Sequence, residues 1–258
     1  MWDPGTYLRY QDERSRPFYD LLARVAADQP RAVVDLGCGP GNLTLALARR
    51  WPDAAITGID SSAEMITTAA ALDGDVTFVA ADLRDWLPDA RTDVVVCNAV
   101  LQWVADHTPL LVRWARALPR SAWLAIQVPG NFDAPSHRAL RTVAADPRWR
   151  DRLALRSDPV LDACGYATLL SDAGCAVDAW ETSYVHQLPT GEDTGHPVLG
   201  WMEGTALRPV RAALDDAEWA DFHTALTERL TEAYPVRHGQ VYFPFRRIFV
   251  VARTDVYG

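Results

Sequence analysis

The sequence contains no lysine, so all 25 basic residues are arginines. This excludes Schiff-base chemistry and lysine general-base chemistry, and any anion must be held by arginine, histidine or backbone amides. Cysteine is scarce as well, and the four cysteines have neither CxxC nor metal-ligand spacing: Cys38, Cys97, Cys164 and Cys175. We therefore expect buried free thiols and no metal site.

Long apolar runs are also missing, and none approaches the ~20 residues that a helix needs to cross a bilayer. Residues 1–5 carry neither a basic segment nor an apolar stretch, so we expect no signal peptide and a cytoplasmic protein. The net charge of −9 disfavours nucleic acid and anionic membranes as partners. With 49% hydrophobic residues, the chain has the composition of a folded protein, and we expect one domain over 1–258.

Short apolar strands alternate with helical patterns through the first half of the chain. The predicted strands are 32–36, 55–60, 76–79, 94–97 and 122–128, and the predicted helices are 42–51, 63–72 and 110–118. Because these strands are apolar throughout instead of alternating, both faces of the sheet must be covered. The pattern is typical of an α/β fold with a doubly wound, mostly parallel sheet.

The second half carries fewer strands and more helical sequence. We expect a helix over 161–173, strands over 177–188 and 248–252, and a long helix over 214–234. An N-terminal helical segment is expected over 5–28. Two largely helical segments, about 130–160 and 189–240, interrupt the sheet pattern, and we expect them to lie over one end of the sheet as a cap.

The strongest local signal is the glycine loop over 35–41, Asp-Leu-Gly-Cys-Gly-Pro-Gly, which lies where a strand ends and a helix begins. Glycines at such a turn let a ligand approach the backbone closely, with helix N-terminal amides facing it. Asp60 ends the next strand, 19 residues after Gly41 (60 − 41), near the spacing of an acid that accepts two ribose hydroxyls. The combination predicts a nucleoside site.

The loop reads G-x-G-x-G, with an acid two residues before the first glycine, whereas dinucleotide sites read G-x-G-x-x-G. Asp35 would repel a pyrophosphate but suits a ligand with an ammonium group, such as the methionine part of S-adenosylmethionine. Past the third strand, Asp82 is placed to accept the adenine amine, although a helix N-cap is an alternative role for it. The predicted cofactor contacts are Asp35, Gly37, Cys38, Gly39, Asn42, Asp60, Ser61, Met65, Ala81, Asp82, Leu83, Asn98, Ala99 and Trp103.

Together, 35–41, Asp60 and Asp82 resemble the class I S-adenosylmethionine-dependent methyltransferases. Segments outside the cofactor half are similar to those of the trans-aconitate 2-methyltransferase family. These include residues 7–17, 101–103, 127–131, 204–209 and 243–253, so that the resemblance covers nearly the whole chain. The stretches 189–203 and 254–258 do not match well, and no residue role is carried over to them.

The resemblance implies a Rossmann-like, seven-stranded sheet whose last strand runs antiparallel. It also implies a monomeric, cytoplasmic enzyme that methylates a carboxylate of trans-aconitate and converts S-adenosyl-L-methionine to S-adenosyl-L-homocysteine. A carboxylate is already ionised near neutral pH, so we assign no catalytic base and expect the enzyme to act by positioning. Charge cancels during the transfer, which favours a dry, aromatic pocket; Tyr19, Trp103 and Phe132 are candidate walls.

A tricarboxylate keeps two further anionic groups while the third one reacts. Guanidinium groups hold such anions best, because they donate two parallel hydrogen bonds. Arg208 is the favoured clamp, since it lies between apolar residues and a proline. The other predicted substrate contacts, besides Tyr19 and Trp103, are Arg14, Asn131, His137, His186, Arg246 and Arg247. His107 either faces the cofactor or lies on the surface at a helix start.

Alternatives remain open from the residues alone. The same chemistry on another small carboxylic acid is the nearest, followed by a non-catalytic S-adenosylmethionine-binding protein. A nucleic-acid or protein methyltransferase is disfavoured, because residues 98–101 read Asn-Ala-Val-Leu where such enzymes carry Asn-Pro-Pro-Tyr. An NAD-dependent oxidoreductase is opposed by Asp35 and by the loop spacing.

Overall fold

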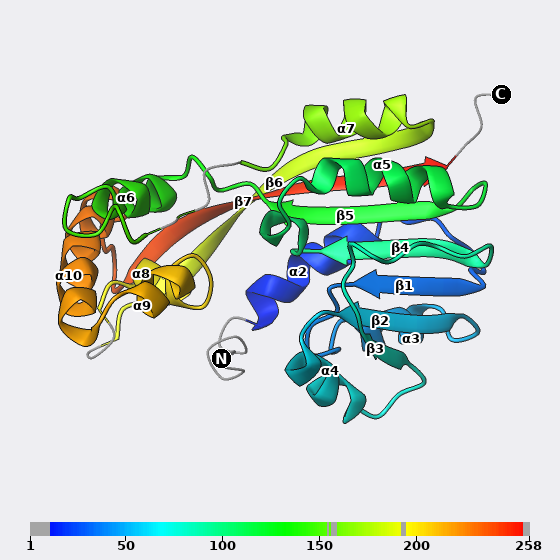
Figure 1. The fold of residues 1–258 in the computed structure, drawn as a ribbon, viewed down its shortest axis with the longest axis horizontal. Helices are drawn as coiled ribbons and strands as arrows, with labels where there is room; N and C mark the ends of the chain where they lie inside the picture. Colours follow the sequence, from blue (N-terminus) through cyan, green and yellow to red (C-terminus); the bar gives the residue numbers. More distant parts are fainter. Residues whose placement is uncertain (1–10, 154, 156–158, 192–194, 255–258) are drawn as a thin grey trace. The chain divides into compact units, whose positions relative to one another are not determined.

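The computed structural model describes residues 11–153, 155, 159–191 and 195–254, with the backbone alone for 11–14. A seven-stranded sheet has the order β3-β2-β1-β4-β5-β7-β6 (Figure 1). Strands β1 to β5 pair in parallel, and β7 runs antiparallel to β5. This confirms the predicted doubly wound α/β fold. The strands are β1 Ala32–Leu36, β2 Ala55–Asp60, β3 Thr77–Ala80, β4 Thr92–Asn98, β5 Trp123–Pro129, β6 Cys175–Pro189 and β7 Gln240–Thr254.

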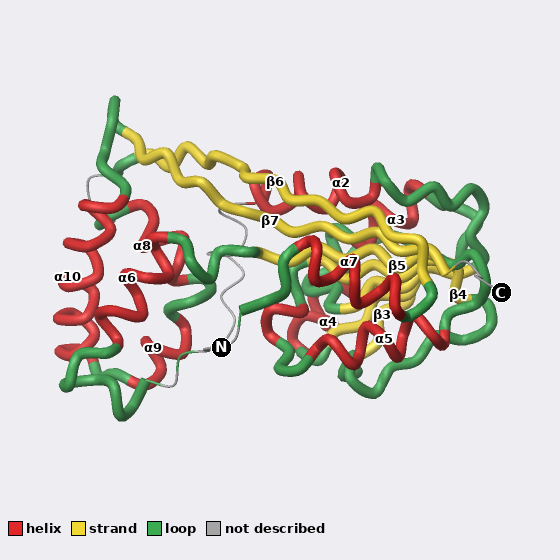
Figure 2. The backbone as a smooth tube through the Cα atoms, turned by 90° about the horizontal axis from the view of Figure 1, so that it is seen from above, coloured by secondary structure: helices red, strands yellow, loops and turns green. Residues whose placement is uncertain are grey.

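Strand β1 lies between β2 and β4, where the strand order reverses, and this is the position at which doubly wound sheets bind their ligands. Figure 2 shows α2 and α3 on one side of the strands and α5 and α7 on the other. The helices are α2 Gln11–Leu22, α3 Thr44–Arg50, α4 Ala63–Ala70, α5 His107–Ala117, α6 Pro135–Ala144, α7 Ala163–Asp172, α8 Pro197–Glu203, α9 Arg208–Ala213 and α10 Asp216–Ala233, with a short 3-10 helix η1 over Leu101–Trp103.

The chain divides into two compact units. We call residues 14–129, 160–182 and 247–258 the sheet unit, and residues 1–13, 130–159 and 183–246 the helical unit. The core of the sheet unit includes Trp114 and Tyr166, both fully buried. The core of the helical unit is strongly aromatic, with Trp149, Trp201 and Phe243 among its members. Each unit thus has a hydrophobic core of its own.

Two strands, β6 and β7, are longer than predicted. The last strand begins at Gln240 and not at Ile248, and β6 runs from Cys175 to Pro189. Buried and exposed residues alternate over the added part of β7, which is the pattern of a strand with one face covered. Pro244 breaks the apparent strand in the sequence, but in the structure it takes an exposed position.

Burial of the thiols was predicted correctly for three of the four cysteines. Cys38, Cys97 and Cys175 are buried, whereas Cys164 is exposed on α7. In the described part of the chain no cluster of three or more His, Cys, Asp or Glu residues has the arrangement of a metal site. Nor does any described helix combine the length and the hydropathy required to cross a membrane.

Candidate cofactor and substrate sites

The loop after β1 is shaped by three glycines with positive φ angles: 77° at Gly37, 55° at Gly39 and 83° at Gly41. The backbone N–H groups of Gly37 and Cys38 both donate to the carbonyl of Ile59, at 2.7 and 3.0 Å. These bonds fold the loop back onto the end of β2. A Cβ atom at Gly37 would collide with the side chain of Val100, so the close approach at this point requires glycine.

Asp35 lies near the end of β1, just before this turn, as a buried acid with 4% of its surface exposed. Thr44 Oγ1 donates a 2.7 Å hydrogen bond to Asp35 Oδ2. Burial is the largest cause that raises the pKa of Asp35 to about 6; the Thr44 hydrogen bond opposes this rise and the charge of Asp60 adds to it. No described cation forms an ion pair with Asp35. A buried carboxylate in this situation fits an incoming ammonium group.

Asp60 ends β2 and is held rigidly by backbone amides. Gly39 N donates to Asp60 Oδ2 and Ser62 N donates to Asp60 Oδ1, each at 2.9 Å. Ser62 in turn caps α4, because its side chain accepts from Met65 N. Each carboxylate oxygen has a second acceptor position, so Asp60 can still receive two ribose hydroxyls. The glycine loop and the carboxylate are therefore fixed to one another before any ligand binds.

Asp82 occupies a turn after β3 and does not begin a helix. Arg84 Nε lies 3.0 Å from both carboxylate oxygens, and Arg84 N donates to Oδ1 at 2.8 Å. These hydrogen bonds from Arg84 lower the pKa of Asp82. An adenine amine would therefore have to share this carboxylate with a guanidinium group. The neighbouring Ala81 is exposed, and Leu83 is half-buried.

The segment after β4 contains several predicted cofactor contacts. Ala99 has a φ angle of 58° and bonds to the carbonyl of Gln127 through its N–H, at 2.8 Å. Asn98 Oδ1 is buried without a hydrogen-bond partner in the described chain, and Trp103 is 60% exposed. His107 is neither on the surface nor without partners: it is 4% exposed and its Nε2 shares a 2.7 Å hydrogen bond with Tyr166.

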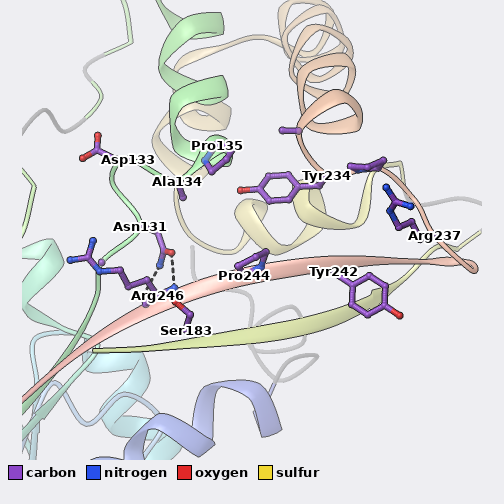
Figure 3. A pocket seen from close by; sticks show the side chains of 13 residues that line it. Asn131, Asp133, Ala134, Pro135, Ser183, Tyr234, Arg237, Tyr242, Pro244 and Arg246 are labelled. Carbon is purple, nitrogen blue, oxygen red and sulfur yellow. Dashed lines mark hydrogen bonds between the residues drawn. The ribbon is translucent and has the colours of Figure 1, made fainter. Parts of the chain in front are cut away.

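Two of the predicted substrate contacts line one cavity of about 540 Å³ in the helical unit (Figure 3). Asn131 uses both ends of its amide to hold the backbone of Arg246, with Nδ2 donating to the carbonyl and Oδ1 accepting from the N–H, each at 2.9 Å. Sequence reasoning missed the other polar residues of this cavity, which come from segments far apart in the chain: Asp133, Ser183, Tyr234, Arg237 and Tyr242.

The other predicted contacts are dispersed. His186 is buried and stacks on Trp201 at 4.6 Å between ring centroids. Burial, followed by the charge of Arg141, lowers the pKa of His137 to about 4, so this side chain is neutral at pH 7. Arg208 begins α9 and is partly exposed. None of these three lines the cavity in the helical unit.

In the sheet unit, Arg247 is 5% exposed and donates from Nη1 to Gln127 Oε1 at 3.5 Å. Tyr19 on α2 is 50% exposed. In the helical unit, the guanidinium carbon of Arg141 lies over the ring of Phe132, at 4.1 Å from the ring centroid. The side chain of Arg14 lies outside the described residues.

Comparison with known proteins agrees with this geometry. A family model described as a methyltransferase domain matches residues 33–120. A trans-aconitate 2-methyltransferase from Mycolicibacterium gilvum is 57% identical, over 98% of this chain and 99% of that protein. Another, from Rhodococcus jostii, is 56% identical over 99% of this chain and 100% of that protein. The YcgJ protein from Bacillus subtilis has a similar fold, with a TM-score of 0.62 at 14% identity, over 93% of this chain and 99% of that chain.

The sheet order, the glycine loop and the acids at the ends of β1 and β2 define a class I methyltransferase, whose cofactor is S-adenosyl-L-methionine. Identity of more than half over almost the full length is far more selective than the fold. The chain belongs to the trans-aconitate 2-methyltransferase family.

Proposed function

We propose that this protein transfers a methyl group from S-adenosyl-L-methionine to a carboxylate of trans-aconitate, giving a methyl ester and S-adenosyl-L-homocysteine. The observation that carries the proposal is the full-length similarity to relatives that bear the name of this activity, at 51–57% identity. The buried Asp35 supports it independently, because a carboxylate of raised pKa and no described ion pair suits a cationic cofactor.

In this proposal Asp35 receives the ammonium group of the cofactor and Asp60 receives the two ribose hydroxyls. The glycine loop brings backbone amides close to the ligand, and Asp82 accepts the adenine amine beside Arg84. We propose further cofactor contacts from residues adjoining these acids, namely Gly37, Cys38, Gly39, Asn42, Ser61, Met65, Ala81, Leu83, Asn98, Ala99 and Trp103. These residues hold and orient the cofactor without taking part in bond making.

When bound, the cofactor would supply a methyl group on a sulfonium. A carboxylate oxygen of the substrate would attack the methyl carbon in line, so that the O–C bond forms as the C–S bond breaks and the thioether sulfur leaves. The protein need not remove a proton, because neutral pH lies about three units above the ordinary pKa of a carboxyl group, which is therefore already ionised. Its contribution is to align the oxygen with the methyl group and to exclude water while the two charges cancel.

The acid substrate would be held by cations and neutral donors. Arg14, Arg208, Arg246 and Arg247 remain the proposed sources of positive charge, and Tyr19, Trp103, Asn131, His137 and His186 are proposed to complete the pocket. We also propose a monomeric, cytoplasmic enzyme that does not act on nucleic acid or membranes. The net charge of −9 supports the part of this proposal that concerns polyanions.

A methyl-transfer screen with mass detection tests the proposed function. The protein is incubated with S-adenosylmethionine and, separately, with trans-aconitate, cis-aconitate, citrate, succinate and a monocarboxylic acid. We expect trans-aconitate to give the highest kcat/KM and a product that is one methyl group heavier. Faster turnover of another acid would reassign the substrate, and cofactor binding without turnover of any acid would indicate a binding protein.

A further inference from the structure

Four polar side chains form a row across neighbouring strands of the sheet unit: Asp35 on β1, Asn98 on β4, Gln127 on β5 and Arg247 on β7. Asn98 and Gln127 are paired in register, and Arg247 is paired with Pro129, at the same edge of the sheet. We call these residues the polar row. It lies at the end of the sheet where β1, β4 and β5 finish, which is also the end that carries the glycine loop.

The four side chains point to the same face. Side chains alternate between the two faces of a sheet, so the neighbours of each row member face the opposite way. Those neighbours belong to the core around Trp114, on the side of α5 and α7: Val34, Leu36, Cys97, Ile126, Val128 and Ile248. The polar row therefore lies on the face that Figure 2 shows covered by α2 and α3.

The row changes from acceptors to donors along its length. At one end, the carboxylate of Asp35 and the buried Oδ1 of Asn98 are acceptors, and the latter has no partner in the described chain. At the other end, Gln127 is fully buried and its Nε2 likewise lacks a partner among the described residues. Arg247 donates to Gln127 Oε1, and because a guanidinium only donates, this contact fixes the amide orientation and leaves the buried Nε2 as a donor without an acceptor in the described chain.

An apolar or aromatic ligand would not provide the acceptor that Gln127 Nε2 lacks. Burying an amide N–H without an acceptor is unfavourable, and a ligand oxygen that accepts from it recovers that cost. A carboxylate is the group that can accept from an amide N–H and from a guanidinium at the same time. The 3.5 Å contact between Arg247 and Gln127 is long enough for both donors to turn toward such a ligand.

We propose that Gln127 and Arg247 form the subsite that binds a non-reacting carboxylate of the acid substrate. This rests on the function proposed above. Asp35 and Arg247 are separated by three strand spacings, about 14 Å, and by a further four residues along the strands, which is too far for the ammonium and carboxylate of a single amino-acid group. The cofactor therefore takes the acceptor end of the row, and the donor end is left for the substrate.

The carboxylate held there is not the one that reacts. A guanidinium bound to the attacking oxygen would stabilise its charge more before the transfer than after, which raises the barrier. On a non-reacting carboxylate the same interaction persists throughout and fixes the orientation of the substrate. Gln127 is thus a specificity-determining residue; it lies in the segment 127–131, for which the sequence by itself indicates no role at this position.

Three variants test the subsite: Arg247→Met, Arg247→Lys and Gln127→Met. Arg253→Met is the matched control, because Arg253 lies on the same strand and the same face, six residues away, with its guanidinium over Trp123. For each protein we would measure the KM for trans-aconitate and the Kd for S-adenosylhomocysteine. Titration with propane-1,2,3-tricarboxylate, a saturated analogue, in the presence of S-adenosylhomocysteine reports substrate binding without turnover.

We expect Arg247→Met to weaken tricarboxylate binding and raise KM about 30-fold or more, and Arg247→Lys to recover part of the loss. Gln127→Met should raise KM about tenfold while the unfolding temperature changes little, because the apolar group removes a buried amide N–H that has no acceptor in the described chain and loses only the long 3.5 Å contact to Arg247. A merely structural glutamine would not show this separation. Affinity for S-adenosylhomocysteine should change less than threefold, and Arg253→Met should resemble the wild type.

Two results would overturn the subsite. Loss of S-adenosylhomocysteine affinity with unchanged tricarboxylate binding would assign Arg247 to the carboxylate of the cofactor. Unchanged affinity for both ligands in Arg247→Lys and Gln127→Met would make the pair structural, and in that case the proposed function still stands. Conversely, a wild-type protein that binds the analogue through Arg247 but does not methylate trans-aconitate would retain the subsite and refute the proposed function.

Discussion

The sheet unit and the helical unit build their candidate sites in different ways. In the sheet unit, Asp35 and the three glycines lie within seven consecutive residues, and Asp60 follows on the adjacent strand. In the helical unit, the cavity draws on residues from three distant segments, and Asn131 bonds to Arg246 across 115 residues of sequence. A site at the ends of strands uses residues that are close together in the sequence. A site formed by packing of distant segments does not.

The two sites also differ in the burial of their charged side chains. The sheet unit buries Asp35 without an ion pair to any described residue, so the charge of this carboxylate is not balanced within the described chain. The helical unit keeps Arg237 exposed at its cavity, where water screens the charge. Substitutions in the sheet unit should therefore have larger effects than those in the helical unit, and four experiments test this contrast.

The largest effect is expected for Asp35→Asn. The amide keeps an acceptor for Thr44 but loses the charge that receives the ammonium, so cofactor affinity should fall by about 2–5 kcal/mol. Because the folded state raises the pKa of Asp35, ionisation destabilises the free protein as pH rises from 3.8 to about 6. Asn should thus increase stability at pH 7, by up to about 3 kcal/mol.

Calorimetric titration and thermal unfolding of the ligand-free protein measure these two effects. Thr44→Val is a matched control, because it removes the hydrogen bond while leaving the charge in place. A variant Asp35→Asn that is less stable than the wild type at pH 7, or that binds S-adenosylhomocysteine normally, would remove the electrostatic contrast between the units.

Gly37→Ala should come next. Its Cβ would overlap the side chain of Val100 at a positive φ angle, so we expect a loss of about 1–3 kcal/mol in unfolding free energy. Gly39→Ala provides the comparison, because no described residue lies within 4 Å of a Cβ there and only the φ penalty of about 1–2 kcal/mol applies. Denaturant unfolding distinguishes the two, and equal losses would show that crowding by Val100 does not matter.

The third test is the pH dependence of cofactor binding. Below about pH 6 Asp35 is protonated in the free protein, so binding of an ammonium must expel that proton. Affinity for S-adenosylhomocysteine should therefore fall by up to tenfold per pH unit below pH 6 and stay level from pH 6.5 to 8.5. An affinity that is level down to pH 5 would contradict the assignment of Asp35.

The smallest effect is expected in the helical unit. Arg208 is partly exposed, so a bond from it to a substrate carboxylate is screened, and Arg208→Ala should cost about 0.5–1 kcal/mol in kcat/KM. Affinity for S-adenosylhomocysteine should not change. Steady-state kinetics with trans-aconitate provide the measurement. A 100-fold loss of kcat/KM would make Arg208 the main clamp. It would contradict the expectation that substitutions in the helical unit have the smaller effects.

Sequence reasoning reached the order of elements and the glycine loop because both depend on local patterns. Continuous apolar strands predicted a buried parallel sheet, and the turn after β1 requires glycine for its backbone angles. It underestimated β7, since Pro244 interrupts the apolar pattern, and the surface alternative for His107 was wrong, because that side chain is buried and shares a hydrogen bond with Tyr166. Burial of a polar side chain depends on distant partners that no short window contains.

The sequence by itself determined the class of the fold, the cofactor and the positions of the acids near the ends of β1 and β2, because these depend on spacing along the chain. Only the tertiary structure decided which polar side chains share a face. Arg246 and Arg247 are adjacent in sequence, yet they lie on opposite faces of β7, one lining the cavity of the helical unit and the other beside Gln127. The pleat of a strand separates such neighbours, and only strand pairing shows which partners each one meets.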